Sequence, residues 1–423
     1  MRFLFVHQNF PGQFVHIVRH LLASGAHDVV FVTGANGNTI PGVRRVTYQV
    51  PPRATASIHS DARDFELAMA RAESVVRAAR QVKGLGFEPD IIIGHHGWGE
   101  LLNLADVWPG APLLGYHEFY YHLQNQDVGF DPEFPVDPKS FSSIRAKNAV
   151  NLLALTNPGY GQTPTRFQLD TYPKWAKPSI TLLPEGVNLD ICRPNAARRG
   201  TTIADIRIKA NEKLVTYIAR DLEPYRGFHI ALRALPKLMA ERPDVRVVMV
   251  GGDSVSYGAR LARGTWREHL LKEVGRGIDM DRIHFPGRIA YSEYVRLLQR
   301  SDTHIYLTYP FVASWSLREA MACACAIVAS DTAPVREFIT HGKTGMLTPF
   351  FEPTTLAERI LELLEGGPRV ERMRAAARTW AETHLRMDDH LRQYVSLIER
   401  LTGQPLQPGE GSRGATGRKR STK

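Results

Sequence analysis

One stretch of the sequence carries residue types that suit an anion. Residues 304–308 form an apolar run that predicts a buried strand, and the short loop 309–313 follows it. Residues 314–321, with two serines and a glutamate, then predict a helix. A helix that begins just after a strand points free backbone N–H groups and the positive end of its dipole at the loop. This order of elements favours a phosphate-bearing ligand.

The same residues have a purely structural alternative. Ser316 and Glu319 have the spacing of a capping box, in which both side chains satisfy backbone donors at a helix start. Met321 and Cys323 would then be core residues. Because short motifs have low specificity, spacing alone does not separate the capping role from a ligand role.

Two arginines stand at another predicted strand end. The strand 214–219 leads into a turn that contains Arg220 and Arg226. A guanidinium group can hold a phosphate through two hydrogen bonds, so a pair of arginines beside a strand-to-helix turn suits a diphosphate. Surface charges on a loop are the alternative, and the position at a strand end favours the ligand role.

The first half of the chain also places polar residues after predicted strands. Gly12 lies in a Pro-Gly turn at a helix start, where a ligand could approach the backbone, although a simple tight turn is the reading that the residues alone favour. His95, His96 and His117 follow two later strands. A zinc site would need a tight histidine pair with a nearby carboxylate, which is not readable here, so we predict no metal.

Length and composition limit the class of protein. A chain of 423 residues predicts two domains, and 43% hydrophobic residues indicate a globular protein. The three cysteines form no plausible disulfide framework, and Cys323-x-Cys325 is expected to be packing, which favours a cytoplasmic location. No run approaches the roughly 18 apolar residues of a membrane span, and no signal-peptide pattern precedes the first strand.

The formal net charge of +10 suits phosphates, anionic lipid or nucleic acid. The aromatic and basic platform that single-stranded nucleic acid needs is missing, so we predict no nucleic-acid partner. Part of the charge lies in the tail 403–423, which is rich in glycine and serine and is expected to be disordered. Peripheral contact with the inner face of a membrane is an open alternative to a solvated tail.

Strand-like and helix-like segments alternate along the whole chain, which predicts an α/β fold with parallel, doubly wound sheets. No Gly-x-Gly-x-x-Gly follows the first strand, so the dinucleotide fingerprint is absent. The predicted strands are 3–7, 28–33, 45–50, 90–94, 112–116, 152–156 and 180–183 in the first half, and 214–219, 245–250, 283–285, 304–308 and 326–329 in the second.

The second half of the sequence resembles the nucleotide-sugar-binding domain of family 4, or group 1, glycosyltransferases. The matching motifs are Glu319-Ala320-Met321-Ala322, Ile327-Val328-Ala329-Ser330-Asp331, Glu337 and Gly342-Lys343-Thr344-Gly345-Met346-Leu347. Residues 184–190 resemble the entry to that domain, with Glu185 where asparagine is usual. One position departs from the pattern, because Phe311 stands where the family carries the first of two glutamates.

The resemblance implies the GT-B fold, with two Rossmann-like, doubly wound parallel-sheet domains facing across a cleft. We expect an acceptor-side domain over 1–195, a nucleotide-sugar-binding domain over 196–380, a helix over 381–402 that crosses back to the first domain, and the tail 403–423. The implied activity is retaining and metal-independent transfer of a sugar. The co-substrate would be a UDP- or GDP-linked sugar, no further cofactor is expected, and the acceptor would be a glycan, a lipid or a small molecule.

The resemblance also implies roles for site residues. His117 is the catalytic candidate, because a histidine after an N-domain strand lies close to the donor sugar in such enzymes; a structural histidine is the alternative. Arg220, Arg226 and the N–H groups of 314–317 would hold the diphosphate, and Glu319 would accept from ribose hydroxyls. The full donor-binding set is Gly12, Arg220, Arg226, Ser314, Trp315, Ser316, Leu317, Glu319 and Glu337.

Other functions stay open at this point. A GT-B epimerase would share the architecture, whereas a phosphorylase would need a cofactor lysine or phosphate site that the sequence does not show. A non-catalytic sugar-nucleotide-binding or membrane-surface module is the alternative from another class, and Phe311 and the basic tail leave it open. An enzyme consumes its donor and a module only binds it. The donor base, the acceptor and the oligomeric state are not specified by the sequence.

Overall fold

The computed structural model describes residues 1–52, 57–157, 159–195 and 200–406, so most of the predicted tail lies outside the described residues. The chain divides into two compact units. The first consists of Met1–Gln124, Pro135–Pro184 and the residues from Asp388 onward, and the second of Asn125–Phe134 and Glu185–Met387. The second unit therefore contains a short segment from the first half of the chain, which the sequence did not indicate.

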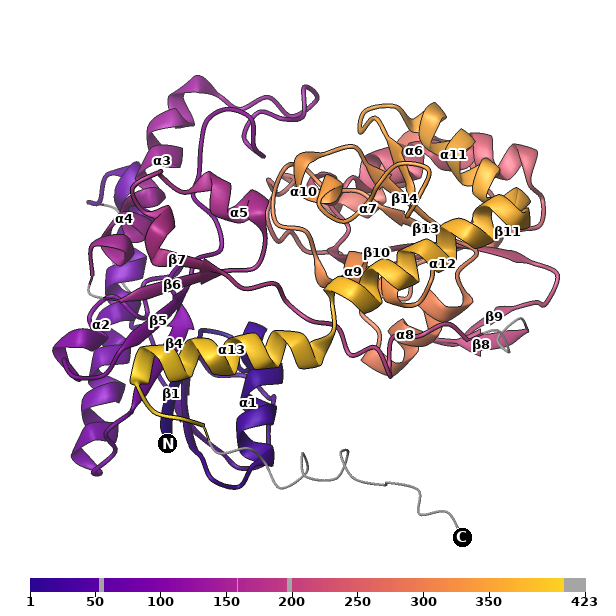
Figure 1. Ribbon diagram of the computed structural model, residues 1–423. Helices are drawn as coiled ribbons and strands as arrows, with labels where there is room; N and C mark the ends of the chain where they lie inside the picture. Colours follow the sequence, from indigo (N-terminus) through magenta and orange to yellow (C-terminus); the bar gives the residue numbers. More distant parts are fainter. Residues whose placement is uncertain (53–56, 158, 196–199, 407–423) are drawn as a thin grey trace, which may run out of the picture. The chain divides into compact units, whose positions relative to one another are not determined.

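The first unit is built on a seven-stranded sheet with the order β3-β2-β1-β4-β5-β6-β7 (Figure 1). Every neighbouring pair is parallel, as the alternation of strands and helices predicts. The strands are β1 (Arg2–Val6), β2 (Asp28–Thr33), β3 (Val43–Thr47), β4 (Ile91–His95), β5 (Leu113–Tyr116), β6 (Tyr160–Thr163) and β7 (Ile180–Leu182). The helices are α1 (Val15–Ala23), α2 (Arg63–Gly84), α3 (Phe141–Ala146), α4 (Asn148–Thr156), α5 (Arg166–Thr171) and α13 (Met387–Thr402).

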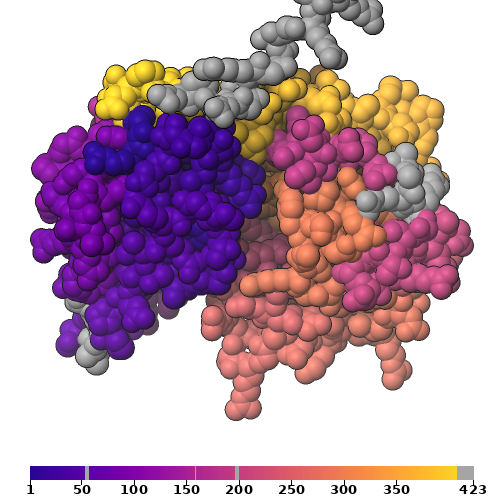
Figure 2. Space-filling view, turned by 90° about the horizontal axis from the view of Figure 1, so that it is seen from below, coloured from indigo at the N-terminus to yellow at the C-terminus, as the bar shows by residue number. Residues whose placement is uncertain are grey.

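Alternate residues of β1 face opposite layers, since side chains of a strand alternate between the two faces of a sheet. Phe3 and Phe5 pack in one cluster with residues of α1 and α13, and Leu4 and Val6 pack in another with residues of α2. Both faces of the sheet are thus covered, which explains why residues 3–6 of this inner strand are all apolar. Figure 2 shows α13, in yellow, against the indigo N-terminal part of this unit.

The predicted strand at 152–156 is wrong, because these residues belong to helix α4 and the strand β6 follows it. A short apolar run fits a buried strand and a helix equally well by hydrophobicity. The two asparagines of α4 decide the matter, since they lie three residues apart and both turn toward the segment 119–121. Asn148 bonds the backbone N–H and C=O of Tyr121, and Asn151 donates to the carbonyl of Phe119.

The second unit contains a six-stranded parallel sheet with the order β12-β11-β10-β13-β14-β15. The strands are β10 (Lys213–Asp221), β11 (Val245–Gly252), β12 (Ile283–His284), β13 (Thr303–Tyr306), β14 (Ile327–Ser330) and β15 (Met346–Thr348), with a hairpin of β8 (Thr201–Ile203) and β9 (Ile206–Ile208) beside it. The helices are α6 (Phe228–Glu241), α7 (Trp266–Val274), α8 (Tyr291–Arg300), α9 (Trp315–Ala322), α10 (Ala333–Arg336), α11 (Pro353–Glu365) and α12 (Gly367–His384). Two parallel-sheet units confirm the predicted fold class.

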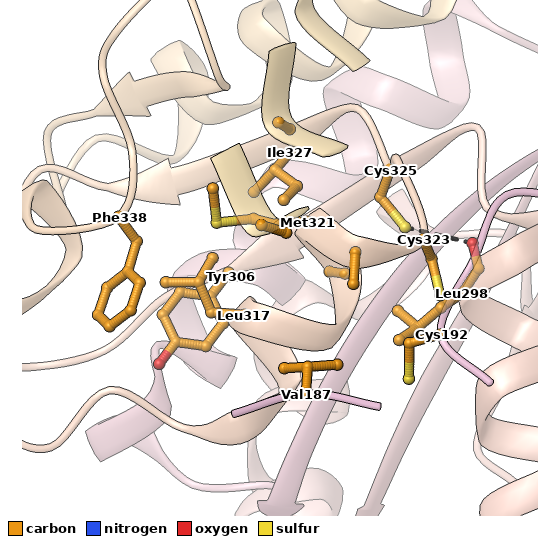
Figure 3. Packing of buried hydrophobic residues seen from close by; sticks show 14 of the residues in the cluster. Val187, Cys192, Leu298, Tyr306, Leu317, Met321, Cys323, Cys325, Ile327 and Phe338 are labelled. Carbon is orange, nitrogen blue, oxygen red and sulfur yellow. Dashed lines mark hydrogen bonds between the residues drawn. The ribbon is translucent and has the colours of Figure 1, made fainter. Parts of the chain in front are cut away.

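The core of the second unit gathers around α9 (Figure 3). Leu317 and Met321 of this helix are fully buried, and Cys192, Cys323 and Cys325 pack in the same cluster as free thiols. The thiol of Cys325 donates to the carbonyl of Leu298 at 3.2 Å. Cys323 and Cys325 therefore serve as packing residues, as predicted, and Cys192 packs with them. Among the described residues, no helix is both long and apolar enough to cross a membrane.

Candidate functional site

Helix α9 begins at Trp315, with Ser314 as its N-cap in an extended conformation. The predicted alternative of a capping box at Ser316 and Glu319 is wrong, because the helix starts before Ser316 and Glu319 binds other residues. Ser314 donates its backbone N–H to the hydroxyl of Tyr306 at 2.7 Å, and its Oγ lies 2.6 Å from that of Ser316. The first N–H groups of a helix lack i−4 acceptors, but in this turn the N–H of Ser314 is bonded to Tyr306 and that of Leu317 donates to the carbonyl of Ser314 at 3.3 Å.

Glu319 lies on the side of α9 that faces α8. Its two carboxylate oxygens accept from the hydroxyls of Tyr291 at 2.7 Å and Tyr294 at 2.5 Å. Burial raises the pKa of this carboxyl, although the two tyrosine hydrogen bonds oppose the shift. Each oxygen keeps a second lone pair, so a ligand hydroxyl would share the carboxylate with the two tyrosines.

Arg226 is the buried cation of the site. It lies in the 3-10 turn Pro224–Arg226 after β10, and its Nη1 donates to Thr308 Oγ1 at 2.7 Å and to the carbonyl of Val312 at 2.9 Å. Its guanidinium lies over the ring of Tyr257, 5.0 Å from the centroid. Arg226 thus connects the turn after β10 to the loop that leads into α9. Arg220 is exposed at the end of β10, so the two predicted cations differ in setting.

The turn beside Arg226 requires glycine. Gly227 has a φ of +71°, and a Cβ there would lie 2.4 Å from the Cβ of Leu307. A side chain at this position would collide with the strand-end segment that Arg226 binds. The close approach of the turn to this segment therefore depends on Gly227.

Glu223 is a functional candidate that the sequence reasoning missed. It is fully buried and accepts from the backbone N–H groups of Ser256, Tyr257 and Gly258 at 3.0, 3.2 and 2.9 Å. Burial raises the pKa of its carboxyl, and the three N–H groups oppose that shift. Glu223 holds the loop after β11 against the arginine turn. No short motif marks it, because its partners lie more than one element away.

Phe311 occupies an apolar position, which accounts for the missing glutamate. Its ring is buried and lies 5.4 Å from the ring of Tyr225 and 5.2 Å from that of Tyr257. Three aromatic rings thus surround the space next to Arg226. A carboxylate here would lie among aromatic rings, and the guanidinium of Arg226 already donates to Thr308 and Val312, so burying its charge would be costly.

Trp315 and Arg318 share one acceptor on the segment that enters the second unit. The indole N–H of Trp315 and Nη1 of Arg318 both donate to the same oxygen of Glu185, at 2.9 and 2.8 Å. Arg318 is almost fully buried, so Glu185 neutralises a charge inside the unit. The unusual glutamate of the sequence is therefore paired. Glu337 is half-buried at the C-terminal end of α10.

In the first unit, histidines gather at the carboxyl ends of β1, β4 and β5. Gly12 has a φ of +55°, and a Cβ there would lie 2.9 Å from the ring of His7. The ring centroids of His7 and His95 lie 5.5 Å apart. Nε2 of His95 lies 3.4 Å from a carboxylate oxygen of Glu118. His7 was missed as a candidate, although its position directly after the first strand is a readable signal.

His117 is buried, and its ring lies 4.9 Å from that of His96. Its Nδ1 has no hydrogen-bond partner among the described residues. Burial lowers the pKa of the imidazole to about 3, and His95 shifts it in the same direction. The ring is therefore neutral near neutral pH. A neutral imidazole can donate or accept one hydrogen bond at this sheet edge without adding a positive charge.

Within the described residues, one group has the geometry of a metal site. Ligand atoms of Asp131, Glu133 and His229 all lie within 4.8 Å of one another. Tyr309 donates to Asp131 at 2.6 Å, and Arg233 donates to both oxygens of Glu133 at 2.6 and 2.7 Å. Because protein donors already satisfy both acids, we do not assign a cation to them.

Two family models match the chain over most of its length. The model described as glycosyl transferase family 4 group matches residues 25–192, and the model described as glycosyl transferases group 1 matches residues 199–380. The chain belongs to the group 1 glycosyltransferases. This confirms the resemblance that the motifs of the second half predicted, and it extends the family to the first half.

Known relatives of this glycosyltransferase are distant in sequence. A D-inositol 3-phosphate glycosyltransferase of Thermobispora bispora is 27% identical over 232 residues, which cover 52% of this chain and 51% of that protein. The chain thus matches about half the length of this curated relative. Sucrose-phosphate synthase from Thermosynechococcus elongatus has a TM-score of 0.72 at 18% identity, covering 95% of this chain and 99% of that one. HepE of Anabaena in complex with UDP-glucose has a TM-score of 0.65 at 18% identity, covering 95% and 100%.

These solved structures confirm the GT-B architecture of the glycosyltransferase. Within its second unit, Arg226 donates to the carbonyl of Val312, in the loop 309–313 that leads into the turn 314–317. The first residue of that turn, Ser314, donates its backbone N–H to Tyr306. Glu319 points from the same helix toward α8. The predicted donor residues of this unit thus fall into two groups, Arg226 with the turn 314–317, and the separate carboxylate of Glu319.

Proposed function

We propose that this glycosyltransferase is a retaining, metal-independent enzyme that takes its sugar from a nucleotide-diphosphate donor. The observation that carries the proposal is the connection of Arg226 to the loop before helix α9. A buried guanidinium and a helix start at the carboxyl end of a parallel sheet suit a diphosphate. HepE, which shares the fold, was solved with UDP-glucose, and this supports a UDP-linked donor over a GDP-linked one.

The residues suit the chemistry of a leaving diphosphate. Breaking the bond to the anomeric carbon transfers negative charge to the diphosphate, and fixed positive groups stabilise that charge. Arg226 and the helix start at 314–317 fill this role in the proposal, with the exposed Arg220 as a second cation. A divalent cation is then unnecessary for charge balance. Glu319 would bind ribose hydroxyls, and Glu337 would contribute a weaker donor contact.

His117 is the proposed catalytic residue, with Gly12 as a backbone contact to the donor. Because its imidazole is neutral, His117 would act through a hydrogen bond to the sugar and would not repel the positive charge that develops on the ring. The acceptor in this proposal is a glycan, a lipid or a small molecule. The three free cysteines support a cytoplasmic location, with any membrane contact peripheral.

The test is a thermal-shift panel of UDP, GDP, ADP and their sugars, each with and without EDTA. We expect one nucleoside diphosphate to raise the melting temperature equally in both conditions. The shift should be lost in Arg226→Met and retained in the control Arg242→Met, whose partner Asp244 lies away from the site. No shift with any nucleotide would contradict the donor site, and a shift that EDTA abolishes would contradict metal independence.

A non-catalytic sugar-nucleotide module is the second candidate, and the apolar setting of Phe311 favours it. Such a module would bind the nucleotide sugar without consuming it. Release of nucleoside diphosphate from the donor that gives the largest thermal shift separates the two candidates. Product formed with the donor's anomeric configuration, read by NMR, would establish retention, and inverted product would contradict it.

A further inference from the structure

Residues Asn125–Phe134 follow β5 of the first unit in sequence but pack inside the second unit. We call this segment the strap. Its ends continue into residues of the first unit, Gln124 and Pro135. The strap therefore brings side chains from the first half of the chain into the unit that carries Arg226.

Three acidic side chains of the strap bind donors of the second unit. Asp127 accepts from the hydroxyl of Tyr225 at 2.8 Å, and Asp131 accepts from that of Tyr309 at 2.6 Å. Glu133 accepts from two nitrogens of Arg233 at 2.6 and 2.7 Å. Hydrogen bonds to charged groups are roughly twice as strong as neutral ones, so these contacts fix the strap at separate points.

Two aromatic side chains also anchor the strap, one between the acids and one after them. The ring of Phe130 lies 5.1 Å from that of Tyr309, 5.2 Å from Phe350 and 5.0 Å from Phe351. The ring of Phe134 lies 5.6 Å from His229 and 5.2 Å from Trp266. Ring centroids at these separations are in favourable contact. The strap is thus a packed part of the second unit.

The strap's tyrosine partners belong to the two segments that Arg226 joins. Tyr225 precedes Arg226 in its turn, and Tyr309 begins the loop that contains Val312. The backbone N–H of Tyr309 donates to the carbonyl of Tyr225 at 3.1 Å, and the two rings lie 4.8 Å apart. Asp127 therefore holds the turn that carries Arg226, and Asp131 holds the loop that Arg226 binds.

We propose that Asp127 and Asp131 of the strap are positioning residues for the donor diphosphate. They orient Tyr225 and Tyr309, and through them the turn of Arg226 and the loop before helix α9. The inference rests on the proposed function, because the proposed function places the diphosphate of the sugar donor beside the turn of Arg226. It adds that donor affinity depends on residues supplied by the first half of the chain.

A cation is the competing occupant of this region. His229 Nε2 lies 3.0 Å from Asp131, and within the part of the chain that the structure describes neither ring nitrogen of this buried histidine makes a well-directed hydrogen bond. Arg233, however, places its positive charge directly on Glu133, and it also binds Glu273. A metal ion would have to displace or tolerate that guanidinium, so the strap contacts are the better explanation.

The experiment measures donor affinity and turnover in strap variants of the full chain. Tyr225→Phe keeps the ring and removes only the hydroxyl that Asp127 binds, so it should fold. We expect Asp127→Ala and Tyr225→Phe each to raise KM for the donor, and the Kd for UDP, about tenfold, as loss of one charge-assisted hydrogen bond implies. Asp127→Asn should recover most of the loss, because an amide oxygen also accepts.

The double variant is the decisive sample. If Asp127 acts through Tyr225, the double variant Asp127→Ala/Tyr225→Phe should be no weaker than either single variant. Glu273→Ala is the matched control, since it removes the other carboxylate of Arg233 without touching the strap, and its KM should equal that of the wild type. Additive losses in the double variant would overturn the proposal.

The experiment gives one result if the proposed role of the strap is wrong and another if the proposed function is wrong. Wild-type protein that binds neither UDP nor GDP overturns the donor assignment, and the strap's role with it. Wild-type protein that binds UDP with the same Kd as both single variants overturns the strap alone. A melting temperature that Zn²⁺ raises, with no rise in His229→Gln, would assign Asp131 to a cation and also overturn its positioning role.

Discussion

Glu319 is a buried carboxylate whose structural role can be tested apart from any ligand. Replacing it by alanine leaves the hydroxyl of Tyr294 without its acceptor, and an unsatisfied buried polar group costs about 1–3 kcal/mol. We expect Glu319→Ala to lower the free energy of unfolding of the second unit by about that amount. Glu319→Gln should cost less, because its amide oxygen still accepts. Urea unfolding measures both variants.

The control for this prediction removes the donor in place of the acceptor. Tyr294→Phe alone should be destabilising, and combined with Glu319→Ala it should cost less than the sum of the single changes, because the two groups share one hydrogen bond. An unchanged unfolding free energy in Glu319→Ala would show that the tyrosine contacts contribute little, which would leave ligand binding as the main role of the carboxylate.

Variants of Phe311 test whether the site is adapted to a phenylalanine or has only lost the contact that the family's glutamate makes. Its ring packs between Tyr225 and Tyr257, and the nearby guanidinium of Arg226 is already bonded to Thr308 and Val312. Phe311→Glu would bury a charge among aromatic rings, so we expect a lower melting temperature and no gain in donor consumption. Differential scanning calorimetry and a nucleotide-release assay check the two outcomes.

Phe311→Leu is the comparison for this variant, since it loses volume but adds no charge, and it should be destabilised less. Donor consumption that rises in Phe311→Glu, with an unchanged melting temperature, would show that the family's glutamate fits this position. The aromatic packing would then be dispensable for function.

An ion pair joins the start of β10 to the neighbouring strand β11, and its contribution to stability depends on pH. Glu212 precedes β10 and accepts from Arg246 of β11 at 2.7 and 2.9 Å. The hydrogen bonds from Arg246 lower the pKa of Glu212 to about 2, below the value of about 4.3 for an unfolded glutamate. Since the folded pKa is depressed, the pair stabilises the unit above about pH 4, and this stabilisation is lost as the pH falls toward 2.

Glu212→Gln tests this pH dependence. The melting temperature of the wild type should exceed that of the variant at about pH 5, and the two should converge near pH 2, where the wild-type carboxyl is protonated as well. Arg246 also contacts His284 and the carbonyl of Asp281, so its own replacement would be less specific. A gap that stays constant over the whole pH range would contradict the depressed pKa.

Local patterns predicted most strands but not the contacts between distant segments. Apolar runs such as 28–33 and 245–250 gave nearly the observed strands, because hydrophobic periodicity is a local property. The run 152–156 failed since its length fits helix and strand alike. The strap was unpredictable for another reason: Asp127 and its partner Tyr225 are separated by 98 positions, and no spacing rule reaches that far.

In the candidate site, too, local features could be predicted and contacts between distant segments could not. The turn of Arg226 and the start of α9 were predictable, because a cation or a helix start after a buried strand is visible in the sequence. The roles of Glu223, Glu185 and the tyrosines around Glu319 were not, since each depends on a partner from another element. The sequence thus indicated the turn of Arg226 and the start of α9, and the contacts that support them appeared only in the folded chain.

The two units have separate cores, and the last helix completes the core of the first. Tyr394, Leu397 and Ile398 of α13 pack in one cluster with residues of β1 and α1, and Tyr394 accepts from Gln162 at 2.6 Å. Truncating a fully buried isoleucine to alanine costs about 2–5 kcal/mol. We therefore expect Ile398→Ala to destabilise the first unit by that amount, and Arg400→Ala, an exposed change on the same helix, to have little effect.

Calorimetry with ligand then shows which unit holds the nucleotide. A ligand that binds only the folded form of one unit raises the melting temperature of that unit. Ile398→Ala should lower the unfolding temperature of the first unit and so identify its transition. Leu317→Ala, in the core around α9, should identify the transition of the second unit in the same way. We expect UDP to raise the transition marked by Leu317→Ala and to leave the other in place. Equal shifts of both transitions would mean that the units unfold together or that both bind the nucleotide, and would contradict a donor site confined to the second unit.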